Sequence, residues 1–563
     1  MEEYKKRYER WLASDAVDEK TKAELQSISG DEKEIQDRFY KDLEFGTAGL
    51  RGVIAAGDNR MNVYTVRRAT QGLANYLLQK DPAVVEKGVA IAYDSRNQSD
   101  VFARETAAVF NGNGIKAYVF ESLRPVPELS YTVRKLGCKA GVVITASHNP
   151  AKYNGYKAYW EDGCQVPPPM DSEIIDEVVK VDIFDSIHKM ERAEAEKAGL
   201  YVEIGEEIDS AYIAEIKKRL IDPENLKKCA ADLKIVYTPL HGTGNKPVRR
   251  ILAECGFTQV HVVPEQELPN GNFPTVPLPN PEDPRALEMA CKLGEQIDAD
   301  LIVGTDPDAD RVGIMVKTPE GYKTFTGNMT GMLLTHYILD ARKKTGTLPA
   351  DGFVVKSIVT TEMVRPMAEE YGVELRDVLT GFKYIGQQIL RSEQTGKGTF
   401  LFGFEESYGY LCGTYARDKD AVSAAMLICE MAAICKSQGV SLIDHLEALY
   451  QKYGYYKEAV VSKAFEGIEG AAKMKEIMAA MRANPKSTYA GLKVVAVEDY
   501  LPGYKDYPKS DALRIRLENN CWVCVRPSGT EPKIKFYFGA NGKSAAEAEA
   551  LLQALKAEMT ADM

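Results

Sequence analysis

The sequence predicts an α/β protein built from several domains. At 563 residues the chain exceeds the ~250–300 residues at which a single hydrophobic core stops growing. Near-continuous apolar runs recur along it, each followed by a Gly-rich or polar loop and then by a helix-like segment. They occupy residues 88–96, 139–150, 233–244, 299–311, 352–361 and 398–409. Such runs suit strands that are buried on both faces of a sheet and alternate with helices.

Both ends of the chain are expected to be helical. The first 14 residues place Tyr4, Tyr8, Trp11 and Leu12 on one helical face and lack the apolar core of a signal peptide. Near the other end, Ser544 followed three residues later by Glu547 predicts a capped final helix.

One long segment is expected to be irregular. Residues 264–284 contain seven prolines, so we expect no helix there. An irregular segment of this length inside a compact protein is usually functional or wraps a surface.

Domain boundaries follow from composition. The charged stretch at 185–207 is expected to close a first domain, residues 320–323 to join a second to a third, and a fourth to begin after the helical 442–454. The expected domains are therefore 1–205, 206–320, 321–445 and 446–563.

Composition excludes several classes of protein. Hydrophobic residues make up 45% and charged residues 27% of the chain, and no apolar run approaches the ~18 residues that span a bilayer. A net charge of −11 without a Lys/Arg stripe argues against nucleic-acid binding.

Ten scattered cysteines predict reduced, mostly buried thiols in a cytoplasmic protein. The one CxxC, Cys521 and Cys524, lies in an apolar run and is expected to pack in a strand rather than to bind metal.

Ser147 is a candidate nucleophile. It follows the strand-like GVVIT and precedes His148, Asn149 and Pro150, which places its hydroxyl on a turn at the end of a strand. An ordinary Ser-Asn-Pro turn explains the same residues about as well. A Ser-His dyad is not implied, because adjacent side chains point in different directions and no third orienting group lies nearby.

Three alternating carboxylates are candidate metal ligands. Asp306, Asp308 and Asp310 follow the apolar LIVG, so in an extended loop they can converge on one cation, and hard oxygens suit Mg²⁺. An EF-hand is rejected, because its sixth and twelfth positions hold Arg311 and Lys317 instead of Gly and Glu. The alternative is a solvated acidic turn, although three close like charges repel unless a cation neutralises them.

Two further loops offer groups that bind a phosphosugar. The segment 526–535 carries Arg526, the hydroxyls of Ser528 and Thr530, and backbone amides around Gly529, which together fit a phosphate dianion. In GFEESYG, Glu405 and Ser407 lie two residues apart and can meet sugar hydroxyls. A plain Ser-Gly turn and an exposed acidic turn are the alternatives.

Taken together, these segments make the chain similar to the α-D-phosphohexomutases, close to their phosphoglucomutase branch. The similarity covers nearly the whole chain and keeps the order of the motifs. The matching motifs are FGTAGLRG (45–52), NRMN (59–62), TASHNP (145–150), YNGYK (153–157), TPLHGTG (238–244), DPDADR (306–311), TGFK (380–383), EES (405–407), RDKDA (417–421) and RPSGTEPK (526–533).

The resemblance implies a four-domain α/β architecture, with three related mixed-sheet α/β domains and a C-terminal α+β domain around a central cleft. It implies that Ser147 is carried as phosphoserine and, with the three aspartates, holds one Mg²⁺ per active site, with glucose 1,6-bisphosphate as intermediate and activator. The remaining catalytic candidates by resemblance are His148, Lys157, Arg51, Arg311 and Lys419. The substrate-binding candidates are Glu405, Ser407, Lys383, Arg417, Arg526, Ser528, Gly529 and Thr530.

The resemblance also implies an activity and its partners. The expected reaction interconverts glucose 1-phosphate and glucose 6-phosphate, with phosphosugars as the only partners of a monomer or homodimer. Phe404, Tyr408 and Gly409 depart from the bifunctional phosphomannomutase/phosphoglucomutase branch at the sugar loop. Phosphomannomutase and phosphopentomutase activities stay open, because glucose and mannose differ at one hydroxyl, worth ~1–3 kcal/mol in a permissive pocket. A Mg²⁺ phosphatase and a silent sugar-phosphate sensor are more distant alternatives.

Overall fold

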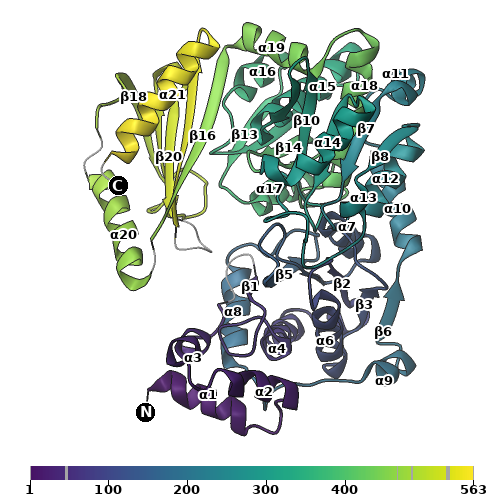
Figure 1. Ribbon diagram of the computed structural model, residues 1–563, viewed down its shortest axis with the longest axis vertical. Coiled ribbons are helices and arrows are strands. Elements are labelled where there is room, and N and C mark those ends of the chain that lie inside the picture. Colours follow the sequence, from purple (N-terminus) through teal and green to yellow (C-terminus); the bar gives the residue numbers. More distant parts are fainter. Residues whose placement is uncertain (1, 45–48, 466, 484–485, 528–532, 562–563) are drawn as a thin grey trace. The chain divides into compact units, whose positions relative to one another are not determined.

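The computed structural model describes residues 2–44, 49–465, 467–483, 486–527 and 533–561. Its contacts divide the chain into two compact units, each of which is described by itself. The first unit contains residues 1–220, 230–322 and 413–426, and the second contains 221–229, 323–412 and 427–563. Four sheets form the framework of the two units (Figure 1).

Three helices at the N-terminus form a small aromatic cluster. They are α1 (Glu3–Ala13), α2 (Glu19–Ser27) and α3 (Glu32–Phe39). Tyr4, Tyr8 and Trp11 are buried in this cluster and Leu12 packs against it, so the predicted amphipathic helix is confirmed. The Trp11 indole also donates a hydrogen bond of 2.8 Å to Asp58, which satisfies its buried N–H.

The first sheet has the strand order β1-β5-β4-β2-β3-β6. Its core strands β2, β4 and β3 are parallel, and β5 pairs antiparallel with β4. Helices α6 and α7 connect the parallel strands and lie on opposite faces of the sheet (Figure 1). The strands are β1 (Leu50–Val53), β2 (Val89–Tyr93), β3 (Ala117–Phe120), β4 (Ala140–Ile144), β5 (Tyr153–Trp160) and β6 (Tyr201–Ile204). The helices are α4 (Val63–Lys80), α5 (Val84–Lys87), α6 (Ser99–Gly112), α7 (Val126–Leu136), α8 (Met170–Lys180) and α9 (Arg192–Lys197).

The second sheet has the order β11-β10-β9-β7-β8. Strands β7, β8 and β9 are parallel and β10 runs antiparallel to β9. The strands are β7 (Lys234–Thr238), β8 (Gln259–Val262), β9 (Leu301–Thr305), β10 (Val312–Thr318) and β11 (Gly321–Phe325). The helices are α10 (Glu206–Lys217), α11 (Pro223–Cys229), η1 (Ala230–Asp232), α12 (Asn245–Glu254), α13 (Pro264–Glu267), η2 (Pro284–Leu287) and α14 (Glu288–Ile297).

The expectation that residues 264–284 contain no helix is wrong at the two ends of that segment. Helix α13 spans Pro264–Glu267 and η2 begins at Pro284. Both prolines stand at the first turn, where a missing N–H costs nothing and the fixed φ favours a helix. The residues between, 268–283, are irregular as predicted.

The third sheet has the order β13-β12-β14-β15, with β12, β13 and β14 parallel and β15 antiparallel to β14. Helices α15 and α16 contact each other, and α17 packs against β12 and β14. The strands are β12 (Gly352–Ser357), β13 (Glu374–Val378), β14 (Thr399–Glu405) and β15 (Gly409–Leu411). The helices of this part of the chain are α15 (Gly327–Lys344), α16 (Val364–Tyr371), α17 (Phe382–Thr395), α18 (Ala421–Ser437) and α19 (Leu442–Tyr453).

The fourth sheet is antiparallel throughout, in the order β16-β21-β20-β19-β18-β17. Helix α21 packs against β16 and β21, and Ser544 caps it by accepting the N–H of Glu547, as predicted. The strands are β16 (Tyr455–Ala464), β17 (Thr488–Tyr489), β18 (Leu492–Asp499), β19 (Leu513–Leu517), β20 (Trp522–Pro527) and β21 (Lys533–Gly542). The helices are α20 (Gly467–Ala483), η3 (Glu518–Asn520) and α21 (Ala545–Thr560).

The first three sheets repeat one topology. In each, a first parallel strand lies beside a second on one side and a third on the other, and an antiparallel strand follows the third through a short loop. Those loops are β4–β5, β9–β10 and β14–β15, and they carry Ser147, the three aspartates, and Glu406 with Ser407. The prediction of three related mixed-sheet α/β domains followed by an α+β domain is confirmed.

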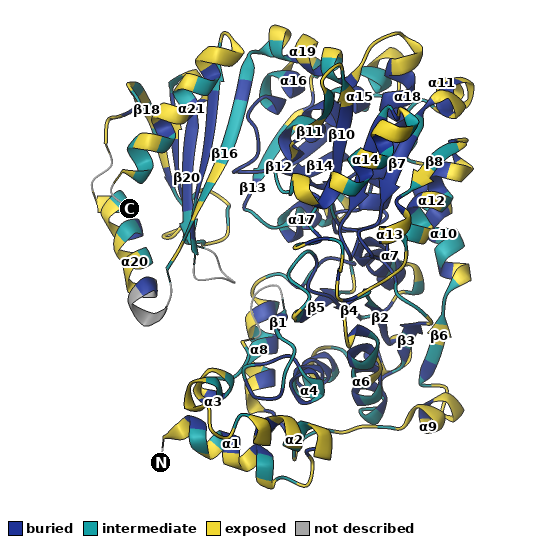
Figure 2. Ribbon diagram, viewed as in Figure 1, coloured by how far each residue is buried: buried dark blue, intermediate teal, exposed yellow. Residues whose placement is uncertain are grey.

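The central strands of the sheets are buried (Figure 2), and most cysteines are buried as well. Nine of the ten cysteines are buried and Cys291 is half-buried. Cys521 and Cys524 belong to the apolar cores of the fourth sheet, which confirms the prediction that this CxxC packs with a strand. Among the described residues no single helix is long and apolar enough to cross a bilayer, and α18 and α19 reach those values only as a pair bent by 90°.

Candidate active site

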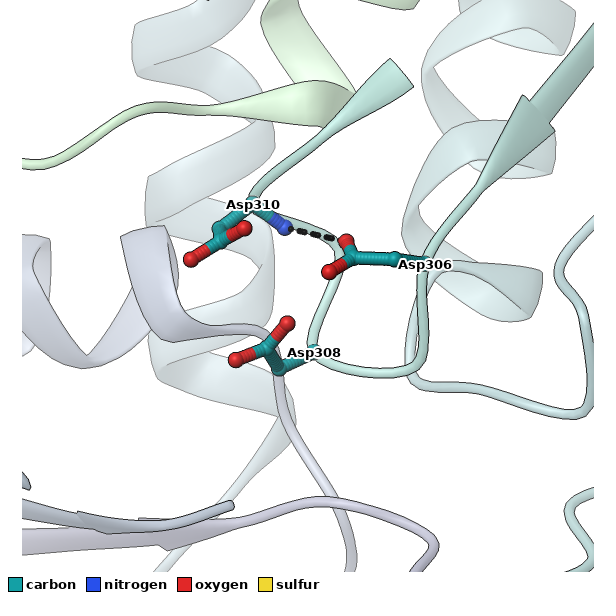
Figure 3. A group of neighbouring side chains, drawn as sticks. All are labelled: Asp306, Asp308 and Asp310. Carbon is teal, nitrogen blue, oxygen red and sulfur yellow. Dashed lines mark hydrogen bonds between the residues drawn. The ribbon is translucent and has the colours of Figure 1, made fainter. Parts of the chain in front are cut away.

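The loop between β9 and β10 gathers three carboxylates. Asp306, Asp308 and Asp310 are fully buried, and a ligand oxygen of each lies within 4.8 Å of the others (Figure 3). Asp306 Oδ1 accepts the backbone N–H groups of Asp310 and Arg311 at 3.1 and 3.0 Å, which folds the loop back on its first residue.

A neighbouring loop supports the carboxylate loop. The carbonyl of Pro307 accepts both the N–H and the hydroxyl of Thr243. Gly242 approaches so closely that a Cβ there would lie 2.4 Å from Pro307 Cα. This contact accounts for Gly242, the first of the two glycines in the TPLHGTG segment.

The donor set fits a divalent metal ion. Asp308 Oδ1 and Asp310 Oδ1 are buried and have no hydrogen-bond partner among the described residues. Burial, and then the charges of Asp308 and Asp310, raise the pKa of Asp306 well above its ordinary value. Three desolvated like charges at this spacing repel, and a hard cation bound to their oxygens removes both the repulsion and the unsatisfied acceptors.

Ser147 lies against the carboxylates. Its hydroxyl donates a 2.6 Å hydrogen bond to Asp306 Oδ2, although the two residues are 159 positions apart. Ser147 has a left-handed φ of 51° on the β4–β5 loop, and its N–H donates to the hydroxyl of Thr145 at 2.8 Å. The Thr145 hydroxyl also lies 3.0 Å from Asp308 Oδ2, so one short chain of contacts joins the serine to two carboxylates.

Cationic side chains surround the same carboxylates. Lys157 of β5 donates to Asp308 Oδ2 at 3.0 Å, and Lys419 lies 2.6 Å from Asp310 Oδ2. Both amines are buried. Burial lowers the pKa of Lys419, but Asp310 and Asp418 outweigh it and raise the pKa above its usual range. Likewise burial raises the pKa of Asp308, but Lys157 and Lys419 outweigh it and lower the pKa.

Arg51 and His148 lie on the serine side of the site. Arg51 lies in β1 and stands opposite Gly155 of the antiparallel strand β5. Burial, followed by the charges of Arg311 and Arg51, holds the pKa of His148 well below its ordinary value, so its ring is neutral at pH 7. His148 Nδ1 lies 3.1 Å from the Ser147 hydroxyl.

Two arginines predicted for the site are engaged inside the first unit. Arg311 is held by an ion pair with Glu282. Arg417 is fully buried and donates through Nη1 to the carbonyls of Thr414 and Ala416. Its backbone N–H donates to the Ser130 hydroxyl.

The second unit carries the predicted sugar loop. Glu405 ends β14 and accepts the N–H of Gly381 at 2.8 Å, which brings it next to the start of α17, where Lys383 lies. Glu406 accepts the hydroxyls of Ser357 and Thr360 at 3.0 and 3.1 Å, while Ser407 is partly exposed. These contacts anchor the loop to β12.

The predicted phosphate loop is described only in part. Arg526 belongs to β20. Ser528, Gly529 and Thr530 lie outside the described residues, as do residues 45–48 of the FGTAGLRG segment.

Sequence reasoning missed several residues that hold the serine loop. Asp94 accepts the Thr145 hydroxyl at 2.6 Å, and Arg96 donates to the carbonyls of Ser147, Asn149, Pro150 and Tyr153. Glu282 holds Arg311. Asp94 and Arg96 stand at the end of the predicted strand 88–96, so their place at a strand end was the available signal.

Sequence comparison assigns the chain along nearly its whole length. The family models for domains I, II and III and the C-terminal domain of phosphoglucomutase/phosphomannomutase match residues 42–183, 210–321, 326–453 and 463–557. The phosphoglucomutase of Staphylococcus epidermidis is 37% identical over 521 residues, which cover 90% of this chain and 92% of that protein. That of Staphylococcus aureus is 37% identical over 519 residues, with 90% of each chain covered.

Solved structures show the same fold at lower identity. Parafusin, a phosphoglucomutase from Paramecium, superposes with a TM-score of 0.70 at 18% identity and covers 92% of this chain and 95% of its own. A phosphoglucomutase/phosphomannomutase family protein from Burkholderia thailandensis gives a TM-score of 0.66 at 17% identity and covers 92% and 97%.

Proposed function

Because the chain belongs to the phosphoglucomutase/phosphomannomutase family, we propose that it is a phosphoglucomutase, an isomerase that interconverts glucose 1-phosphate and glucose 6-phosphate. One observation carries the proposal beyond the family: the Ser147 hydroxyl lies 2.6 Å from a buried aspartate of a three-carboxylate cluster. A hydroxyl so placed can give and take a phosphoryl group, because phosphoryl transfer depends on alignment and charge neutralisation.

We assign Ser147 as the residue that carries the phosphoryl group. As phosphoserine it donates PO₃ to the free hydroxyl of the substrate, which yields bound glucose 1,6-bisphosphate. The regenerated Ser147 hydroxyl then takes the other phosphoryl group, and the isomeric monophosphate leaves. The bisphosphate therefore also serves as the activator, because it can phosphorylate Ser147 in an enzyme molecule that carries no phosphoryl group.

We assign the metal site to Mg²⁺, one ion per active site, held by Asp306, Asp308, Asp310 and an oxygen at Ser147. Bound there, Mg²⁺ would neutralise negative charge on the phosphoryl group. The all-oxygen donor set favours this ion over softer metals.

The surrounding residues supply charge and protons. Arg51 and Arg311 are proposed to neutralise the transferring group, and Lys157 and Lys419 to act as general acid and base at the two ends of the sugar. His148, with its lowered pKa, offers a neutral ring beside the Ser147 hydroxyl. A neutral imidazole can accept or donate a hydrogen bond without adding charge.

The substrate-binding residues remain a proposal from the family motifs. Glu405 and Ser407 would contact the ring hydroxyls, Lys383 and Arg417 would add positive charge, and Arg526, Ser528, Gly529 and Thr530 would hold the phosphate that is not reacting. Ten scattered cysteines without paired spacing fit a reducing compartment, so we propose that the protein acts in the cytoplasm, as a monomer or homodimer.

One assay tests the proposed activity. The protein is incubated with Mg²⁺, a trace of glucose 1,6-bisphosphate and, separately, glucose, mannose and ribose 1-phosphates, and kcat/KM is compared. We expect glucose 1-phosphate to rank first. Turnover of none of the three would refute the mutase, and a higher rank for mannose or ribose would reassign it to phosphomannomutase or phosphopentomutase.

A variant separates the mutase from a phosphatase. Ser147→Ala is expected to abolish both turnover and phosphorylation by glucose 1,6-bisphosphate, with unchanged thermal stability. Peptide mass mapping of the wild type should locate the phosphate on Ser147. A phosphate found on Asp306 instead would indicate phosphatase chemistry.

A further inference from the structure

The proline-rich residues 268–283, here called the strap, lie against the loop that carries Ser147. Gly271 of the strap meets the β2–α6 loop, which holds Arg96, so closely that a Cβ would stand 2.4 Å from Asn97 N. The side chain of Asn97 donates to Asn272 Oδ1 at 2.8 Å. The Phe273 ring covers the guanidinium of Arg96, with the Arg96 Cζ 5.0 Å from the ring centroid.

Arg96 is the residue through which this contact reaches the nucleophile. Its side chain is fully buried, and its two terminal nitrogens donate to four carbonyls, those of Ser147, Asn149, Pro150 and Tyr153. Four carbonyls of one short loop therefore converge on a single planar cation. A lysine ammonium cannot reproduce this fork.

The strap also reaches the metal loop. Glu282 forms an ion pair with Arg311, the residue that follows Asp310, and the carbonyl of Pro281 lies where a Cβ on Gly313 of β10 would be 2.5 Å away. One segment thus contacts both loops whose approach brings Ser147 to Asp306.

The strap itself is anchored in the second domain. His241 Nε2 lies 2.8 Å from the Thr275 hydroxyl, and Gln266 Nε2 donates to the same hydroxyl at 3.1 Å. Phe273 and Val276 are buried with Leu240 and Ala286, and Ala151 of the serine loop packs against this cluster. The hydrogen bonds from His241 and Gln266 hold the strap within the second domain, and the apolar cluster joins it to the serine loop through Ala151.

We propose that Arg96, Phe273 and Glu282 are positioning residues, and that the strap fixes the Ser147 loop and the metal loop in register for phosphoryl transfer. This inference rests on the proposed mutase function. The expected cost of loosening the strap is large, because a displacement of about 1 Å in a reacting group can cost about 100-fold in rate.

The test compares two matched Phe→Leu variants. Phe273→Leu removes the ring over Arg96, while Phe120→Leu removes a ring at the end of β3 that lies 5.4 Å from the Cζ of another arginine, Arg124. Both rings are buried, so similar losses of thermal stability are expected. Phe273→Leu should lower kcat at least ten-fold with KM for glucose 1-phosphate within two-fold of wild type, whereas Phe120→Leu should keep kcat.

Two further variants sharpen the test. Phe273→Tyr keeps an aromatic face and should restore kcat to within two-fold of wild type, and Arg96→Lys should lower kcat without raising KM. Equal kcat values for Phe273→Leu and Phe120→Leu, or wild-type kcat in Arg96→Lys, would overturn the proposal.

Hydrogen exchange gives a readout that does not depend on turnover. Amides of residues 145–156 should exchange faster in Phe273→Leu than in wild type and should be unchanged in Phe120→Leu. Unchanged exchange of these amides in Phe273→Leu would contradict the positioning role of the strap. Absence of turnover in the wild type contradicts the mutase function alone, so the two failures are distinguishable.

Discussion

Asp308 shows how strongly the site depends on single charges. It is buried, its Oδ2 is shared by Lys157 and the Thr145 hydroxyl, and its Oδ1 has no partner among the described residues. The free oxygen is the one available to a metal, while the bonded oxygen fixes the carboxylate. An amide at this position would keep the shape and lose the charge.

Asp308→Asn is therefore expected to weaken Mg²⁺ binding at least ten-fold, because one of three anionic ligands is lost. Isothermal titration of the metal-free protein with Mg²⁺ measures the effect. The exposed Asp298→Asn, at the C-terminal end of α14, is the control and should bind Mg²⁺ as wild type does. Equal affinities of the two variants would remove Asp308 from the ligand set.

The residues that carry chemistry were easier to predict from sequence than those that hold them. Ser147 and the three aspartates stand in short motifs that directly follow apolar, strand-like runs. Arg96 and Asp94 act on Ser147 from about 50 positions away through contacts with backbone carbonyls and with Thr145. Any residue type has a carbonyl, so no pattern at Ser147 reveals its partner.

Helix α4 illustrates how one motif serves a whole element. Asn62, the last residue of NRMN, caps this helix: its side chain accepts the N–H groups of Tyr64 and Thr65, and the Thr65 hydroxyl accepts the N–H of Asn62. Asn62 also donates to the carbonyls of Ala55 and Gly57, which closes the preceding turn.

Asn62→Ala should destabilise the protein by about 1–2 kcal/mol, the usual cost of an N-cap. Asn62→Asp keeps the two acceptor contacts and loses the two donor contacts, so it should fall between Ala and wild type. Urea unfolding monitored by circular dichroism gives the values. An alanine variant as stable as wild type would show that the cap is not what holds the start of α4.

Helix α18 contains a buried acid whose charge opposes folding. Glu430 is fully buried and accepts the N–H groups of Ile221 and Asp222. Burial raises its pKa to about 7. Between pH ~4.5 and 7 the folded protein thus keeps a proton that the unfolded chain releases, and stability falls as pH rises through this interval.

Glu430→Gln is expected to flatten that dependence. The difference in unfolding free energy between pH 5 and pH 8 should shrink by up to about 3 kcal/mol relative to wild type, since one pKa unit corresponds to ~1.4 kcal/mol. The exposed Glu369→Gln should leave the dependence unchanged. Parallel pH profiles for Glu430→Gln and wild type would contradict the raised pKa.

The strands that sequence patterns predicted are the first and third of each repeated sheet. These strands, β2, β4, β7, β9, β12 and β14, lie centrally and read as continuous apolar runs. The second strands β8 and β13 lie at sheet edges and are largely half-exposed or exposed, so their residues carry no such run. Whether a strand could be predicted from its apolar run therefore depended on its position in the sheet, which the sequence does not give.

The candidate metal ligands lie in one of the two units, so metal binding should stabilise that unit more than the other. The three aspartates and Ser147 belong to the first unit, whereas the fourth sheet belongs to the second. Mg²⁺ at 100 times its Kd should stabilise the part that binds it by about 2.7 kcal/mol.

Hydrogen exchange measured with Mg²⁺ and with EDTA tests this expectation. Exchange should slow on metal binding in the β4–β5 and β9–β10 regions and stay unchanged in β18 and β19. EDTA should also abolish mutase turnover, and excess Mg²⁺ should restore it. Uniform slowing over all four sheets would show instead that metal binding is transmitted to the whole chain.

The buried thiols can serve as probes of local unfolding. Burial raises the pKa of Cys138 and Cys524 to about 12, and that of the half-buried Cys291 to about 11, so reactive thiolate is scarce while the protein is native. Alkylating reagents should then modify each cysteine only as fast as the structure around it comes apart. Because the ten are spread along the chain from Cys138 to Cys524, the order in which they are labelled would report which part of the structure opens first.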